Sequence, residues 1–106
     1  MKIIAITACP TGVAHTFMAK SALEKAAKEL GHTIKVETQG ALGIENEITT
    51  SDIEQADILI LGVEVGIDKK ERFDDMRKVN IPINTIIKSA KQVLIQIEQK
   101  LNEQKK

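Results

Sequence analysis

The sequence is poor in several residue types, and each scarcity excludes a class of protein. Its 106 residues include two phenylalanines, one cysteine and no tyrosine or tryptophan. A single thiol cannot form an internal disulfide, and the core must come from Ile, Leu, Val and Ala. Basic and acidic residues number 15 each, whereas nucleic-acid-binding domains usually carry a basic excess. We therefore expect a protein without disulfides that binds no nucleic acid.

Long apolar segments are also missing. The longest, from Ile58 to Val63, is far too short to span a membrane, which takes about 20 apolar residues. Met1 leads straight into a strand-like segment, without the parts of a signal peptide. We expect a cytoplasmic protein that has one domain over residues 1–101 and a flexible tail over 102–106. No His, Asp or Glu spacing suggests a metal site, and no cofactor is expected.

The apolar pattern predicts alternating strands and helices. The expected strands span residues 2–7, 33–38, 58–61 and 79–83. The expected helices span residues 14–30, a short segment capped by Thr50 or Ser51 and ending near 56, a helical turn over 69–76, and 85–101. Residues 39–43 are expected to form a loop, Gly31 to end the first helix, and Pro82 to mark an edge strand.

This alternation is typical of an α/β fold with helices on both faces of a parallel sheet. Right-handed crossovers limit the possible topologies. We therefore expect a flavodoxin-like three-layer sandwich with a four-stranded parallel sheet in the order 2-1-3-4. In such sheets, ligands bind at the carboxyl ends of the strands, where the strand order reverses.

The segment between the first strand and the first helix carries the candidate chemistry. Its sequence is Cys-Pro-Thr-Gly-Val-Ala-His-Thr, beginning at Cys9. A turn containing Gly12 can direct successive backbone N–H groups at one point, and the following helix adds its positive dipole end. Such surroundings lower the pKa of a cysteine thiol and suit a phosphoryl group. The candidate nucleophile is Cys9, and the candidate phosphate loop comprises Pro10, Thr11, Gly12, Val13, Ala14, His15 and Thr16.

Simpler interpretations of the same residues exist. A lone cysteine is often a small buried apolar residue, and a histidine in a first helical turn often faces solvent or caps the helix. Cysteine phosphatases place an arginine six positions after the nucleophile, where it clamps the phosphate. That position holds His15 here, and no arginine precedes Arg72. The loop also lacks the Gly-Lys-Ser/Thr ending of a nucleotide-binding P-loop. A phosphoryl carrier therefore fits these residues better than a phosphatase.

The segment from Cys9 to Ala19 resembles the signature of the fructose-family enzyme IIB of the bacterial phosphoenolpyruvate:sugar phosphotransferase system. A second block, Val36 to Gly40 and on through residues 43–46, is similar to that family's second loop. The resemblance runs from Met1 to about Ile97. It implies that Cys9 accepts a phosphoryl group from a phosphohistidine of IIA. It also implies that Cys9 passes this group to fructose, or a related sugar, entering through the membrane component IIC.

The resemblance implies further site residues and leaves some choices open. Gln39 and Gly40 would flank the site and contact a partner. Asp68 and Arg72 match the family's Asp…Arg-Phe pattern, and a surface salt bridge between the two is the simpler interpretation. The sugar remains open, because mannose-type and mannosylglycerate-type relatives share the motif. Membrane contact is expected only through IIC. The alternative functions are a low-molecular-weight cysteine phosphatase or arsenate reductase, and a non-catalytic binding domain.

Overall fold

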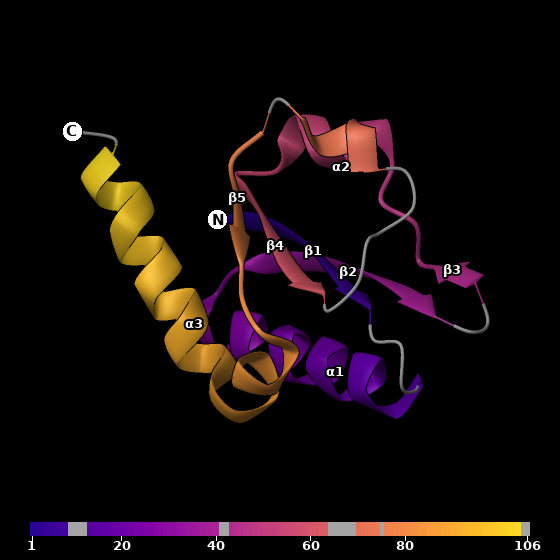
Figure 1. The fold of residues 1–106 in the computed structure, drawn as a ribbon. Coiled ribbons are helices and arrows are strands. Elements are labelled where there is room, and N and C mark those ends of the chain that lie inside the picture. Colours follow the sequence, from indigo (N-terminus) through magenta and orange to yellow (C-terminus); the bar gives the residue numbers. More distant parts are fainter. Residues whose placement is uncertain (9–12, 41–42, 64–69, 75, 105–106) are drawn as a thin grey trace.

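The computed structural model describes residues 1–8, 13–40, 43–63, 70–74 and 76–104 (Figure 1). In chain order the elements are β1 (Lys2–Ala8), α1 (Val13–Leu30), β2 (Thr33–Gly40), β3 (Gly43–Glu45), α2 (Thr50–Gln55), β4 (Ile58–Val63), the 3-10 helix η1 (Lys70–Phe73), β5 (Lys78–Asn80) and α3 (Ile83–Gln104). The expected α/β class is confirmed, since one sheet lies between helical layers.

Within the described residues, the sheet has five strands in the order β3-β2-β1-β4-β5. The four parallel strands follow the expected order, but the expected number of four is wrong. The additional strand, β3, lies within and just after the expected loop and pairs antiparallel with the end of β2. Gly43 has a φ of 91°, a left-handed conformation that glycine adopts without steric strain, and it pairs with Gly40. This hairpin extends the sheet at the edge formed by β2.

Several expected boundaries were also wrong. The last parallel strand spans Lys78–Asn80, so Pro82 follows it instead of lying inside it. The cap of α2 is Thr49, because its hydroxyl accepts the backbone N–H of Asp52 while the Asp52 carboxylate accepts the Thr49 N–H. The final helix starts at Ile83, two residues early, and extends to Gln104 with non-helical backbone at residue 89. Gly31, with a φ of 76°, follows the last residue of α1 as expected.

The two faces of the sheet are covered differently. Helices α1 and α3 cover one face (Figure 1). There they pack on a cluster of buried side chains that includes Ile3, Ala5 and Val36. On the other, a smaller cluster gathers Ile4 and Ile6 of β1 with residues 48 and 73 from the α2 and η1 side. Successive strand residues point to opposite faces, so the unbroken apolar run of β1 supplies both clusters. Across the described residues, no helix is long and apolar enough to cross a membrane.

Candidate functional site

The central strand β1 ends where the candidate loop begins. Its last residue, Ala8, pairs in parallel with Gln39 of β2 on one side and with Val63 of β4 on the other. The chain after β1 crosses by way of α1 to β2, whereas β4 lies on the opposite side of β1. The carboxyl end of β1 is therefore the point at which the strand order reverses, the position where sheets of this kind bind ligands.

Several candidate residues lie outside the part of the chain that the structure describes. They are Cys9, Pro10, Thr11, Gly12 and Asp68. Residues 9–12 join Ala8 to Val13, the first residue of α1. The described structure thus gives the two ends of the loop, which are the end of the central strand and the start of an 18-residue helix.

The first turns of α1 are held against β1. Val13 and Ala14 open the helix, His15 is exposed, and Thr16 is buried. The hydroxyl of Thr7 in β1 donates a buried hydrogen bond of 3.3 Å to the carbonyl of Thr16. The first turn contains no acidic residue, so no carboxylate there offsets the positive end of the helix dipole. This end of α1 favours an anion placed beside it.

The expected flanking residues of the second strand lie beside this position. Gly40 is the last residue of β2, and Gln39 is the partner of Ala8 in the sheet. The Gln39 side chain is buried, and its amide donates a 2.7 Å hydrogen bond to the carboxylate of Glu37. One hydrogen bond of the Gln39 side chain is therefore made to a buried acidic group.

Glu37 forms a buried ion pair with Arg72, across 35 positions of sequence. The two guanidinium nitrogens of Arg72 donate to the two carboxylate oxygens at 2.9 and 3.0 Å. The backbone N–H of Ile48 donates to the same carboxylate at 2.8 Å, and the Ile48 carbonyl accepts from Arg72 at 3.0 Å. The guanidinium carbon also lies 4.6 Å from the centre of the Phe73 ring. This network joins β2, the residues before α2, and η1.

Electrostatics favour the charged form of both partners. Burial alone would raise the pKa of Glu37, but the hydrogen bonds from Arg72, Ile48 and Gln39 outweigh it and lower that pKa. The Glu37 hydrogen bond in turn raises the pKa of Arg72. A surface salt bridge with Asp68 is the simpler interpretation of Arg72 from the sequence, and Asp68 lies outside the described residues. The pairing with Glu37 was missed, and its one sequence signal is a carboxylate placed inside a half-buried strand.

The described residues contain no group of three or more His, Cys, Asp or Glu side chains that could hold a metal ion. The fold and the site together define a doubly wound α/β protein. Its first strand-to-helix connection, at the reversal of strand order, carries a cysteine.

Comparison with known proteins identifies the family. The model of the family described as "PTS system, Lactose/Cellobiose specific IIB subunit" matches residues 4–96. The "PTS system fructose-like EIIB component 2" of Escherichia coli K12 is 50% identical over 97 residues, which are 92% of each chain. A solution structure of an enzyme IIB subunit from Escherichia coli K12 is 44% identical and superposes with a TM-score of 0.93, covering 99% of this chain and 97% of that one. A domain of the fructose-specific IIABC component of Borrelia burgdorferi is 41% identical, with a TM-score of 0.83 and 90% of each chain covered.

The chain therefore belongs to the IIB family of the phosphotransferase system. The family resemblance inferred from the sequence is confirmed, and with it the assignment to a phosphotransferase system that works in sugar uptake.

Proposed function

We propose that this chain carries a phosphoryl group on Cys9, between a phosphohistidine of a IIA protein and a sugar that enters through a membrane IIC protein. The observation that carries the proposal is the position of the loop. Cys9 follows the last residue of the central strand, at the reversal of strand order, and α1 starts at Val13 with no carboxylate in its first turn. This is where backbone N–H groups and a helix dipole favour a thiolate and a bound phosphate.

The chemistry is two in-line displacements at phosphorus. The Cys9 thiolate forms the S–P bond as the N–P bond of the phosphohistidine breaks, and the donor imidazole leaves with the electron pair. In the second step a sugar hydroxyl attacks phosphorus, the S–P bond breaks, and the thiolate is restored while the hydroxyl proton passes to solvent or a base. Residues 11–16 would hold the phosphoryl oxygens through their backbone N–H groups and the hydroxyls of Thr11 and Thr16. Pro10 has no N–H to donate and would contribute only to the shape of the turn.

Fructose, or a closely related sugar, is the proposed acceptor. Relatives from Escherichia coli that are 47% and 50% identical to the chain carry fructose-like names, whereas the family description refers to lactose and cellobiose. Identity of 50% over nearly the whole chain is the more specific of the two observations, and it favours the fructose type. Gln39, Gly40, Asp68 and Arg72 are proposed to flank the site, with Arg72 acting through its buried pair with Glu37.

The experiment is intact-mass spectrometry after incubation with phosphoenolpyruvate, enzyme I, HPr and a fructose-type IIA. We expect the mass to rise by one phosphoryl group in the wild-type chain and to stay unchanged in Cys9→Ser. A rise in Cys9→Ser would place the phosphoryl group on another residue. No rise with a IIA that phosphorylates another fructose-type IIB would contradict the carrier proposal. Hydrolysis of an aryl phosphate by the wild-type chain alone would favour the phosphatase alternative.

A further inference from the structure

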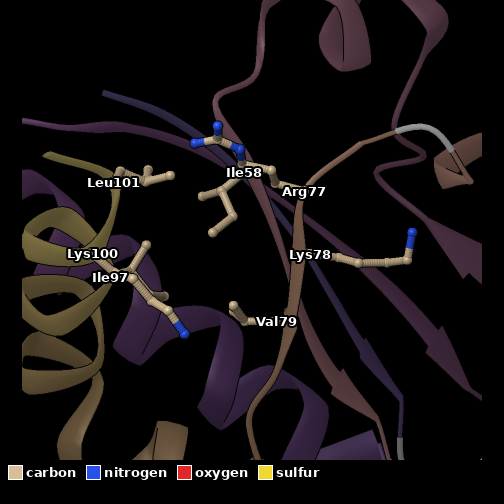
Figure 2. A pocket seen from close by; sticks show the side chains of 7 residues that line it. All are labelled: Ile58, Arg77, Lys78, Val79, Ile97, Lys100 and Leu101. Atoms are coloured by element: carbon tan, nitrogen blue, oxygen red, sulfur yellow. The ribbon is translucent and has the colours of Figure 1, made fainter. Parts of the chain in front are cut away.

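A cavity of about 220 Å³ lies between the sheet and the C-terminal part of α3 (Figure 2). Ile58 is the first residue of β4, and Lys78 and Val79 are the first two residues of β5. The cavity thus opens at the amino ends of the parallel strands, whereas Cys9 follows the carboxyl end of β1. Figure 1 likewise shows the end of α3 and the start of α1 far apart on the molecule. The cavity is distinct from the proposed phosphoryl site.

The floor of the cavity is aliphatic. It is lined by Ile58, Val79, Ile97 and Leu101, and the last two lie one helical turn apart on the same face of α3. These side chains offer dispersion contacts and release of water to an apolar group, but no hydrogen bond that would orient one. Pockets for small molecules usually enclose about 300–1,000 Å³ and contain a few fixed polar groups. The volume here suits one bulky aliphatic side chain better than a metabolite.

The rim of the cavity is positively charged. Arg77 and Lys100 lie on different sides of the cavity in Figure 2, and both are exposed. Neither side chain makes a hydrogen bond or ion pair within the part of the chain that the structure describes. Lys78 differs from them, because its ammonium group donates to the carbonyls of Phe73 and neighbouring residues and points away from the cavity. No carboxylate is among the seven lining residues.

We propose that this cavity is a docking site for a protein segment that inserts one bulky aliphatic side chain between flanking carboxylates. The choice of partner rests on charge complementarity. Two cations without described partners lie on either side of an aliphatic floor, so they would face two carboxylates that flank an inserted aliphatic side chain. A small carboxylate would engage the cations without an oriented contact to the floor. The docked segment would lie at the end of the sheet opposite to Cys9, so it could stay bound while the phosphoryl group is transferred.

The test uses the isotope-labelled chain and a synthetic helical peptide with one central leucine flanked on both sides by glutamates. We expect saturable shifts of the amide resonances of residues 77–79 and 97–101, with a dissociation constant on the order of 1 mM or tighter. Replacing the peptide's leucine by alanine should weaken binding about tenfold. Replacing its glutamates by glutamines should weaken binding about threefold or more.

Matched variants of the chain separate site binding from general charge attraction. The double variant Arg77→Glu/Lys100→Glu should lose the saturable shifts, whereas Lys25→Glu/Lys88→Glu, with the same change of net charge at exposed positions elsewhere, should retain them. Equal loss in both variants, or shifts that never saturate, would refute the docking site. Saturation of the same resonances by octanoate at lower concentration than the peptide would assign the cavity to a small amphiphile instead. Shifts that depend on protein concentration without peptide would assign it to a second copy of the chain. Either result overturns the proposal.

Discussion

Replacing Arg72 by methionine tests the buried ion pair, because it removes the positive charge and keeps an apolar stem beside Phe73. The Glu37 side chain is fully buried, whereas that of Arg72 is 17% exposed. After the substitution the carboxylate keeps its hydrogen bonds from Ile48 and Gln39 but loses its counter-charge. Removal of one partner of a buried pair costs about 3–5 kcal/mol. That is a large share of the roughly 5–15 kcal/mol that stabilises a domain.

The pH dependence of this loss gives a sharper criterion than its size. In the wild type the pKa of Glu37 is lowered, so its stabilising contribution is present above the ordinary carboxylate pKa and falls as pH drops through the folded-state value. Arg72→Met removes the hydrogen bond that does most to lower the pKa of Glu37. Burial should then raise that pKa above the ordinary value. The variant then loses stability as pH rises through its own folded-state pKa. The free energies of unfolding of the two proteins should therefore converge as pH falls.

The assay is urea unfolding followed by far-ultraviolet circular dichroism at pH 5 and pH 8, since the chain has no tryptophan or tyrosine to report by fluorescence. The matched control is Arg77→Met, a substitution of the chain's only other arginine, which is exposed. It should change stability by no more than about 0.5 kcal/mol. The double variant Glu37→Leu/Arg72→Met should regain part of the loss, because it leaves no buried charge. A loss in Arg72→Met below about 1 kcal/mol and equal at both pH values would refute the reasoning.

Three smaller effects should also be measurable by unfolding. Asp52→Asn removes a carboxylate whose pKa the Lys35 hydrogen bond lowers to about 2, so the variant should be less stable at pH 7 and lose less stability than the wild type between about pH 4 and 2. An unchanged acid slope would contradict this. Gly62→Ala should cost about 1–3 kcal/mol, because the added methyl would meet the Cδ1 atom of Ile86 at 2.5 Å. Adding Ile86→Val, which removes that atom, should reduce the cost of the glycine substitution. Thr7→Val should cost about 1 kcal/mol through loss of its buried hydrogen bond to α1, and Thr7→Ser should retain most of the stability.

The sequence was informative wherever local pattern and chain order carry the structure. The apolar runs of β1 and β4 and the apolar periodicity of α3 predicted elements that are present, and Gly31 predicted where α1 ends. The order of the four parallel strands followed because right-handed crossovers leave few arrangements for alternating strands and helices. The family signature from Cys9 to Ala19 is also local, and the comparisons confirmed the family it indicates.

The sequence-based predictions were wrong where the structure depends on short segments or on contacts between distant residues. A three-residue strand such as β3 has no periodicity of its own and exists because the end of β2 offers it a paired edge. Thr49, Thr50 and Ser51 can each cap a helix, and the reciprocal bond with Asp52 selects the first of them. The sequence pattern of Thr49 followed three positions later by an acidic residue is typical of such a cap.

The amino-acid sequence alone determined the alternating elements, the order of the parallel strands and the position of the single cysteine after the first strand. These depend on the period of apolar residues and on connectivity, which are properties of the chain itself. The tertiary structure alone decided that Arg72 pairs with Glu37, 35 residues earlier, and that a cavity with a basic rim opens beneath α3. Such contacts arise because packing brings distant residues together, and the energy of a buried charge depends on which groups surround it after folding.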